Sequence, residues 1–133
     1  MSYATAYRSV QQYAAVGVEA SVTDAKPHYL IQLLLDGVLG RIAAAKGHMQ
    51  RGDVAQKGEC IGQAIGIVSG LRASLNRERG GEIAGNLEAL YDYAELRLLQ
   101  ANVQNELAYL DEVSKLLGEI KGAWDSISTT SSR

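Results

Sequence analysis

Apolar residues recur at intervals of three and four from Pro27 onward, the spacing that places side chains on one face of a helix. The pattern predicts four amphipathic helices, at about 24–50, 53–76, 82–105 and 106–127. Short connections make neighbouring helices antiparallel, so we expect an all-α fold, an antiparallel up-and-down four-helix bundle over residues 23–127. The predicted core positions are Leu30, Leu34, Val38, Ile42, Ala45 and Met49; Val54, Ile61, Ile65, Val68 and Leu75; Ile83, Leu87, Leu90, Ala94, Leu98 and Ala101; Leu110, Val113, Leu117, Ile120, Trp124 and Ile127.

Glycine and polar residues separate these segments. Gly52 can adopt a left-handed turn and Asp53 can cap the helix that follows it. Gly80 and Gly81 mark the next break. Residues 128–133 are small and polar, and we expect them to form a disordered tail.

Residues 1–22 form a short amphipathic N-terminal arm in this interpretation. Tyr7 and Val10 have helical spacing, but Gly17 and a polar linker follow them. The arm is either flexible or docked on the bundle. If it docks, Tyr7, Val10 and Tyr13 are the candidate contact residues.

The second predicted helix carries a row of glycines spaced four residues apart. The row starts beside the core stripe and turns toward the outer side of the bundle along the helix: Gly58, Gly62, Gly66 and Gly70. Cys60 and Ile67 are expected to point to the same outer side. Four glycines in a helix cost about 4 kcal/mol relative to alanine, so something should use the space they leave. The sequence leaves two uses open, which are tight packing within the bundle and close approach of another helix.

A second apolar stripe runs along the third predicted helix, opposite its core face: Ala89, Leu96, Leu99 and Val103. The fourth helix adds Leu116 and Ala123 beside its core line. A second apolar stripe on a bundle helix indicates burial in an assembly or a site for a partner. These residues, with Gly62, Gly66, Ile67 and Gly70, predict a surface that binds a helix in a groove.

The composition limits the function classes. The chain has 133 residues and a net charge of -2, with 47% hydrophobic residues, which fits one soluble domain. Its charge balance argues against nucleic-acid binding. No apolar run reaches the roughly 18 residues of a membrane span, and no signal peptide is evident, so we expect a cytoplasmic location. We also expect a monomer or a weak homodimer.

The sequence offers little for catalysis, and we expect neither an enzyme nor a metal or cofactor site. His28 and His48 lie about 30 Å apart on one predicted helix, too far to share a metal. Cys60 lacks a CxxC partner and is better explained as a small apolar residue. The run from His48 to Gly52 resembles a phosphotransfer four-helix module, but Gly52 ends the helix here, which disfavours that alternative.

Motifs spread over nearly the whole chain from about Tyr13 resemble a known family. They are Pro27 with Leu30-Ile31 and Asp36-Gly37; Gly52-Asp53-Val54 and Lys57-Gly58; Gly80-Gly81-Glu82-Ile83-Ala84, Asn86-Leu87, Leu90-Tyr91-Asp92-Tyr93, Arg97-Leu98 and Ala101-Asn102; and Ala123-Trp124. Together they resemble the bacterial flagellar secretion chaperone FliS family. Lys26, Leu35 and Leu96 depart from residues common in that family.

The resemblance implies a cytosolic helical bundle that binds the C-terminal segment of flagellin and keeps it from polymerising early. It also implies delivery of flagellin to the flagellar type III export gate. By position, Val10 and Tyr13 match arm residues tied to partner binding, and the outer faces of the second to fourth predicted helices match the client grooves. An alternative is a helical-bundle adaptor or regulator that binds an anti-sigma factor through the same grooves.

Overall fold

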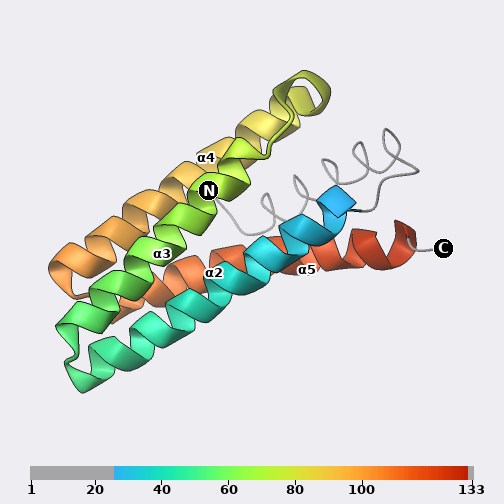
Figure 1. The fold of residues 1–133 in the computed structure, drawn as a ribbon. Coiled ribbons are helices and arrows are strands. Elements are labelled where there is room, and N and C mark those ends of the chain that lie inside the picture. The colour runs from blue at the N-terminus through green and yellow to red at the C-terminus, as the bar shows by residue number, and fades with distance from the viewer. Residues whose placement is uncertain (1–25, 132–133) are drawn as a thin grey trace.

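The computed structural model describes residues 26–131, which form four α-helices (Figure 1). They are α2 (Lys26–Arg51), α3 (Val54–Ala73), α4 (Arg77–Gln104) and α5 (Leu107–Ser131). This part of the chain contains no strand. The arm, with Tyr7, Val10 and Tyr13, lies outside the described residues.

The helices pack in a ring: α2 on α3, α3 on α4, α4 on α5 and α5 back on α2. The diagonal pairs, α2 with α4 and α3 with α5, do not pack against each other. Successive helices run in opposite directions along the molecule (Figure 1). The predicted all-α, antiparallel four-helix bundle is therefore confirmed for the part of the chain that the structure describes.

The connections follow from local chemistry. Gly52 has a φ of 76°, which ends α2, and the Asp53 side chain caps α3 by accepting a hydrogen bond from the Gln56 N–H. Both features match the sequence-based expectation. Asn76 caps α4 in the same way through the Arg79 N–H, and Asn105 ends α4 in the left-handed conformation with a φ of 53°.

Two predicted boundaries were wrong. The chain turns between α3 and α4 at residues 74–76, and α4 already begins at Arg77. Gly81 is a kink inside this helix, where its φ of 50° and ψ of -122° interrupt the helical backbone. At the C-terminus, α5 continues to Ser131, past its predicted end at Ile127.

The core consists mainly of the predicted stripe residues, including Val38, Ile61, Leu98 and Leu117. Leu30, predicted as core, is exposed, and Leu35 is fully buried instead. Residues four apart on a helix point in directions that differ by about 40°. Leu30 lies eight residues before Val38, so its side chain points about 80° away from that of Val38 and outside the core.

The burial of four other residues was predicted wrongly. Val54, predicted as core, is exposed because it is the first residue of α3 and lies beside the turn. Cys60, Leu116 and Ala123 were expected on the outer side and are buried in the core cluster. A helix that packs against two neighbours buries a stripe at least about 100° wide, which includes residues beside its central line.

Candidate partner-binding face

The outward side of α4 carries an uncovered apolar row. Leu96 and Leu99 are 52% and 51% exposed, and Val103 is 82% exposed. Ala89 is exposed on the same side. The buried residues of α4, such as Leu98, lie on the opposite side of the helix. The expectation that this row points away from the core is confirmed, whereas its role in binding remains a prediction.

The glycines of α3 divide into two groups. Gly62, Gly66 and Gly70 are exposed, and a Cβ built on any of them would meet no atom within 4 Å. A Cβ on Gly58 would lie 3.8 Å from the side-chain oxygen of Asn102, so Gly58 adjoins α4. Tight packing within the bundle, one of the two uses left open by the sequence, therefore does not explain the outer three glycines.

The register between α3 and α4 places glycines beside leucines. Gly58 is level with Asn102, and further along the antiparallel pair Arg72 reaches Asp92. Between these two contacts, Gly62 lies at about the level of Leu99 and Gly66 at about the level of Leu96, because each helix rises 1.5 Å per residue. Glycines of α3, which have no side chains, thus lie beside a row of large apolar side chains on α4.

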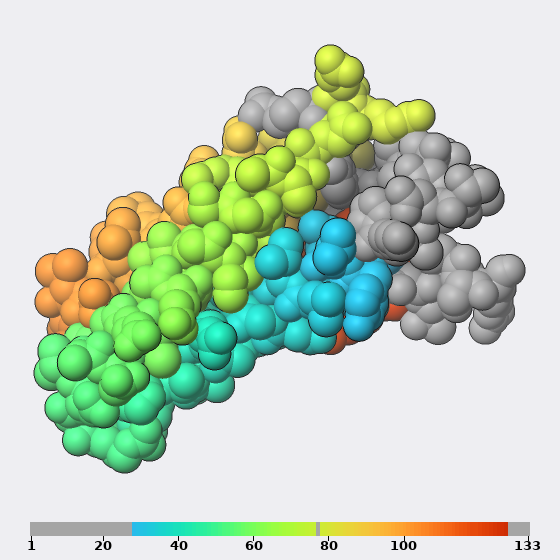
Figure 2. Space-filling model, viewed as in Figure 1, coloured from blue at the N-terminus to red at the C-terminus, as the bar shows by residue number. Residues whose placement is uncertain are grey.

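We call this surface the α3–α4 face and define it by Gly62, Gly66, Ala89, Leu96, Leu99 and Val103. Figure 2 shows the α3 side of the molecule, with α3 between α2 and α4. Gly70, also predicted for the site, is exposed, whereas Ile67 is half-buried beside α2. A Cβ on Gly37 of α2 would lie 3.6 Å from the Ile67 side chain.

Lys57 ties the start of α3 to the end of α4. Its side chain is buried, and the ammonium group donates hydrogen bonds to the Asn102 carbonyl oxygen at 3.1 Å and to Asn105 Oδ1 at 3.0 Å. A cation stabilises a helix C-terminus, where unpaired carbonyl oxygens carry partial negative charge. Apolar periodicity does not predict a buried charge, so the sequence signal for this lysine was its place in the Lys57-Gly58 motif.

Arg72 joins the two helices near the other end of the α3–α4 face. Its Nη1 atom lies 2.8 Å from Asp92 Oδ1 and 2.9 Å from Glu95 Oε2. The hydrogen bonds to Glu95 and Asp92 raise the pKa of Arg72. Ion pairs this exposed contribute little to stability, so their main effect is on side-chain position.

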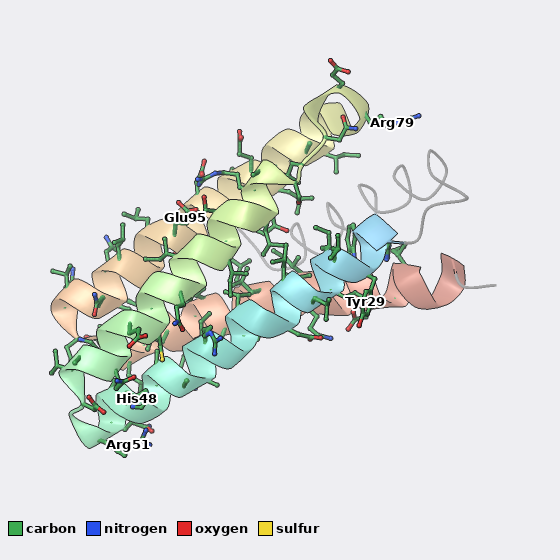
Figure 3. The ribbon with its side chains drawn as sticks, viewed as in Figure 1. Tyr29, His48, Arg51, Arg79 and Glu95 are labelled. Carbon is green, nitrogen blue, oxygen red and sulfur yellow. The ribbon has the colours of Figure 1, made fainter. Side chains whose placement is uncertain are left out.

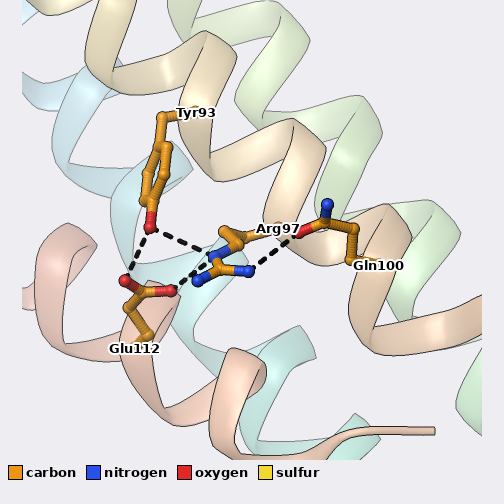
Figure 4. Close-up of polar contacts among 4 residues, drawn as sticks. All are labelled: Tyr93, Arg97, Gln100 and Glu112. Carbon is orange, nitrogen blue, oxygen red and sulfur yellow. Dashed lines mark hydrogen bonds and ion pairs between the residues drawn. The ribbon is translucent and has the colours of Figure 1, made fainter. Parts of the chain in front are cut away.

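A third set of polar contacts joins α4 to α5 (Figure 4). Arg97 Nε donates to Glu112 Oε1 at 2.8 Å, and the Tyr93 hydroxyl donates to Glu112 Oε2 at 2.7 Å. The Arg97 guanidinium also lies 4.2 Å from the centre of the Tyr109 ring, within the range of a cation–π interaction. With Lys57 and Arg72 on the α3 side, these contacts fix how α4 is rotated about its axis.

The remaining candidate chemistry lies away from this face. His48 and Arg51 lie at the end of α2 that adjoins α3, and Tyr29 lies at its opposite end (Figure 3). The His48 ring nitrogen Nδ1 is 3.1 Å from Arg51 Nη2. Within residues 26–131, no group of three or more His, Cys, Asp or Glu side chains is arranged to hold a metal ion. None of the described helices combines the length and apolar character needed to cross a membrane.

Known proteins resemble this chain over most of its length. A family model described as "Flagellar protein FliS" matches residues 9–131. "Flagellar secretion chaperone FliSB" of Pseudomonas aeruginosa is 54% identical over 92% of this chain and 98% of the relative. "Flagellar secretion chaperone FliS" of Salmonella typhimurium is 46% identical over 92% of both chains, and that of Bacillus subtilis is 34% identical over 78% of this chain and 77% of the relative.

Proposed function

Because this chain belongs to the flagellar protein FliS family of secretion chaperones, we propose that its client is flagellin. In this proposal the chain binds the C-terminal segment of flagellin in the cytosol, prevents premature polymerisation and delivers flagellin to the flagellar type III export apparatus. The chaperone is not an enzyme, and its action consists of masking and release.

The observation that carries the proposal is the α3–α4 face. Leu96, Leu99 and Val103 form a row of large apolar side chains on a helix whose core side is already complete. Covering a half-exposed leucine contributes about 1 kcal/mol, so the row contributes a few kcal/mol to binding of an apolar helix face. A segment that polymerises through apolar helix faces is masked when it binds here.

The glycine strip of α3 determines how closely the client approaches. Gly62 and Gly66 leave open space beside Leu99 and Leu96, so a client helix can place its own side chains against the α3 backbone. A client that is disordered alone spends part of the binding free energy on becoming ordered. The complex is then tight enough to protect the client and weak enough to release it during export.

The first test compares two exposed leucines on different helices. Leu99→Asp places a charge in the α3–α4 face, whereas Leu33→Asp places one on α2, which does not pack against α4. Both variants should remain folded by circular dichroism, because both side chains are exposed. Calorimetry with flagellin should show at least about tenfold weaker binding for Leu99→Asp and little change for Leu33→Asp.

Flagellin lacking its C-terminal segment provides the second arm of the test. The proposal requires that this truncated flagellin fails to bind the wild-type chaperone. Undiminished affinity of Leu99→Asp for full-length flagellin would overturn the assignment of the face. In the regulator alternative, Leu99→Asp weakens the binding of an anti-sigma factor rather than the binding of flagellin.

A further inference from the structure

The exposed row of α4 belongs to a longer stripe with a regular spacing. Counting from the kink at Gly81 toward the C-terminus of α4, the steps alternate between three and four residues: Glu82, Gly85, Ala89, Asp92, Leu96, Leu99 and Val103. All of these positions are exposed except Gly85, which is half-buried. The stripe follows the 3.5-residue repeat of a coiled-coil seam on a side of α4 that no described helix covers.

This spacing specifies how another helix can dock. A stripe repeating every 3.5 residues stays in contact with a partner helix that crosses at about 20° and winds around it with a left-handed twist. The shared length from position 82 to position 103 is about 30 Å at 1.5 Å per residue. A helix crossing at about 50° would instead contact only one or two turns of α4.

Asp92 is the polar residue in the centre of the stripe, and Glu82 is a second acidic residue at the end of the stripe next to the kink. Its side chain is 57% exposed and is held by Arg72, whose Nη1 atom also contacts Glu95. One nitrogen atom thus serves two carboxylates, and the three side chains together carry a net negative charge. A cationic or amide side chain on a docked helix would complement Asp92, whereas an apolar side chain would bury this carboxylate without a new partner.

We propose, on the basis of the function proposed above, that the client docks as one helix along α4 in coiled-coil packing, with Asp92 setting its register. The client helix carries apolar residues at alternating three- and four-residue steps. A lysine, arginine, asparagine or glutamine interrupts this row where it meets Asp92. A single polar position inside an otherwise apolar seam is a known way of excluding shifted registers at some expense of affinity.

Disulfide crosslinking tests the docking geometry. Cysteine is introduced at Ala89 or at Val103 in a chain whose buried Cys60 is changed to alanine, and each variant is paired with a cysteine scan of the flagellin C-terminal segment. Coiled-coil packing predicts that the two positions crosslink to client residues fourteen apart, equal to their own separation. Leu33→Cys on α2 is the control and should crosslink to none of them.

A crossing geometry gives a different result, in which no client helix reaches both Ala89→Cys and Val103→Cys. That outcome would overturn the coiled-coil proposal, and the proposed function would stand if Leu99→Asp still weakened binding. Undiminished binding of Leu99→Asp would overturn both. The crosslinks also show whether the client runs parallel or antiparallel to α4.

Asp92→Leu tests the control of register. The variant makes the seam apolar from Ala89 to Val103, and Glu95 keeps Arg72 in place. The measurement compares the affinity for the flagellin segment with the affinity for the same segment whose heptad pattern is shifted by one turn. In Asp92→Leu, we expect the ratio of these two affinities to fall by at least about tenfold. Asp111→Leu on α5 is the matched control, because Asp111 is similarly exposed and paired with Lys46. An unchanged preference in Asp92→Leu would overturn the role of Asp92.

Discussion

Replacing glycines of α3 by alanine should stabilise the free chaperone while weakening client binding. Gly62 and Gly66 are exposed within a continuous helix, and a Cβ at either position meets no atom within 4 Å. A methyl group therefore adds helix propensity without a clash in the free bundle. The same methyl groups occupy the space that the proposed client helix uses.

The magnitude follows from helix propensity. Alanine is favoured over glycine by about 1 kcal/mol at an exposed helix position, so the double variant Gly62→Ala/Gly66→Ala should gain about 2 kcal/mol in its free energy of unfolding. For a chain of this size the melting temperature should rise by about 6 to 10 °C. Urea denaturation followed by circular dichroism measures the first quantity, and a thermal scan measures the second.

The control is Gly40→Ala on α2, where the added methyl group also meets no atom within 4 Å. It should raise stability by about 1 kcal/mol and leave the affinity for flagellin unchanged. The double variant should bind flagellin at least about fivefold more weakly, a loss of about 1 kcal/mol. A loss of stability in the double variant would refute the reasoning about open space, and unchanged affinity would refute the use of that space by the client.

Other predictions concern the packing and titration of the bundle. Burial lowers the pKa of His28, and the negative charge of Asp125 offsets only part of this decrease. The unfolded state therefore binds the proton more readily than the folded state does. Stability should therefore be fully present above pH 6.5, the ordinary pKa of histidine, and fall as the pH drops below it. Protonation of His28, stacked on Trp124 at 4.3 Å, should also change the fluorescence of this single tryptophan, and His28→Gln should abolish both effects. Lys57→Met leaves the last oxygens of α4 without their donor and should cost about 1 to 3 kcal/mol by urea denaturation; a neutral result would contradict its role as a cap. Leu116→Ala should cost about 2 to 5 kcal/mol because Leu116 is buried, and a value near zero would instead support the outer position expected from sequence.

Much of the fold could be predicted because its information is local. The intervals between apolar residues give four helices, and Gly52 with Asp53 gives the first turn through their own backbone preferences. The Gly80-Gly81 pair was misleading for a physical reason. A glycine with positive φ breaks the helical backbone, but Asn76 had already capped α4 upstream, so the chain kinks where a loop was expected.

The candidate site could be predicted only in part. Leu96 and Leu99 lie almost opposite the centre of the core stripe, so small errors in the ideal wheel do not change their exposure. Leu116 and Cys60 lie beside the core line, where exposure depends on how closely two neighbouring helices approach, and the sequence pattern does not contain that information. Lys57 and Arg72 owe their roles to partners on α4, which become neighbours only when the bundle forms.

The polar contacts on both sides of α4 explain how a bundle can keep an apolar row exposed. A helix with leucines on its outer side would gain hydrophobic free energy by rotating them toward its neighbours. Lys57 and Arg72 contact α4 from α3, and Glu112 of α5 contacts Arg97 of α4, so any rotation breaks polar contacts on both sides at once. The core on the opposite side of α4 is also filled, which leaves no space for more side chains. The α3–α4 face is therefore formed without a partner, and if the proposed client binds there, the entropic cost of ordering falls on the client rather than on the chaperone.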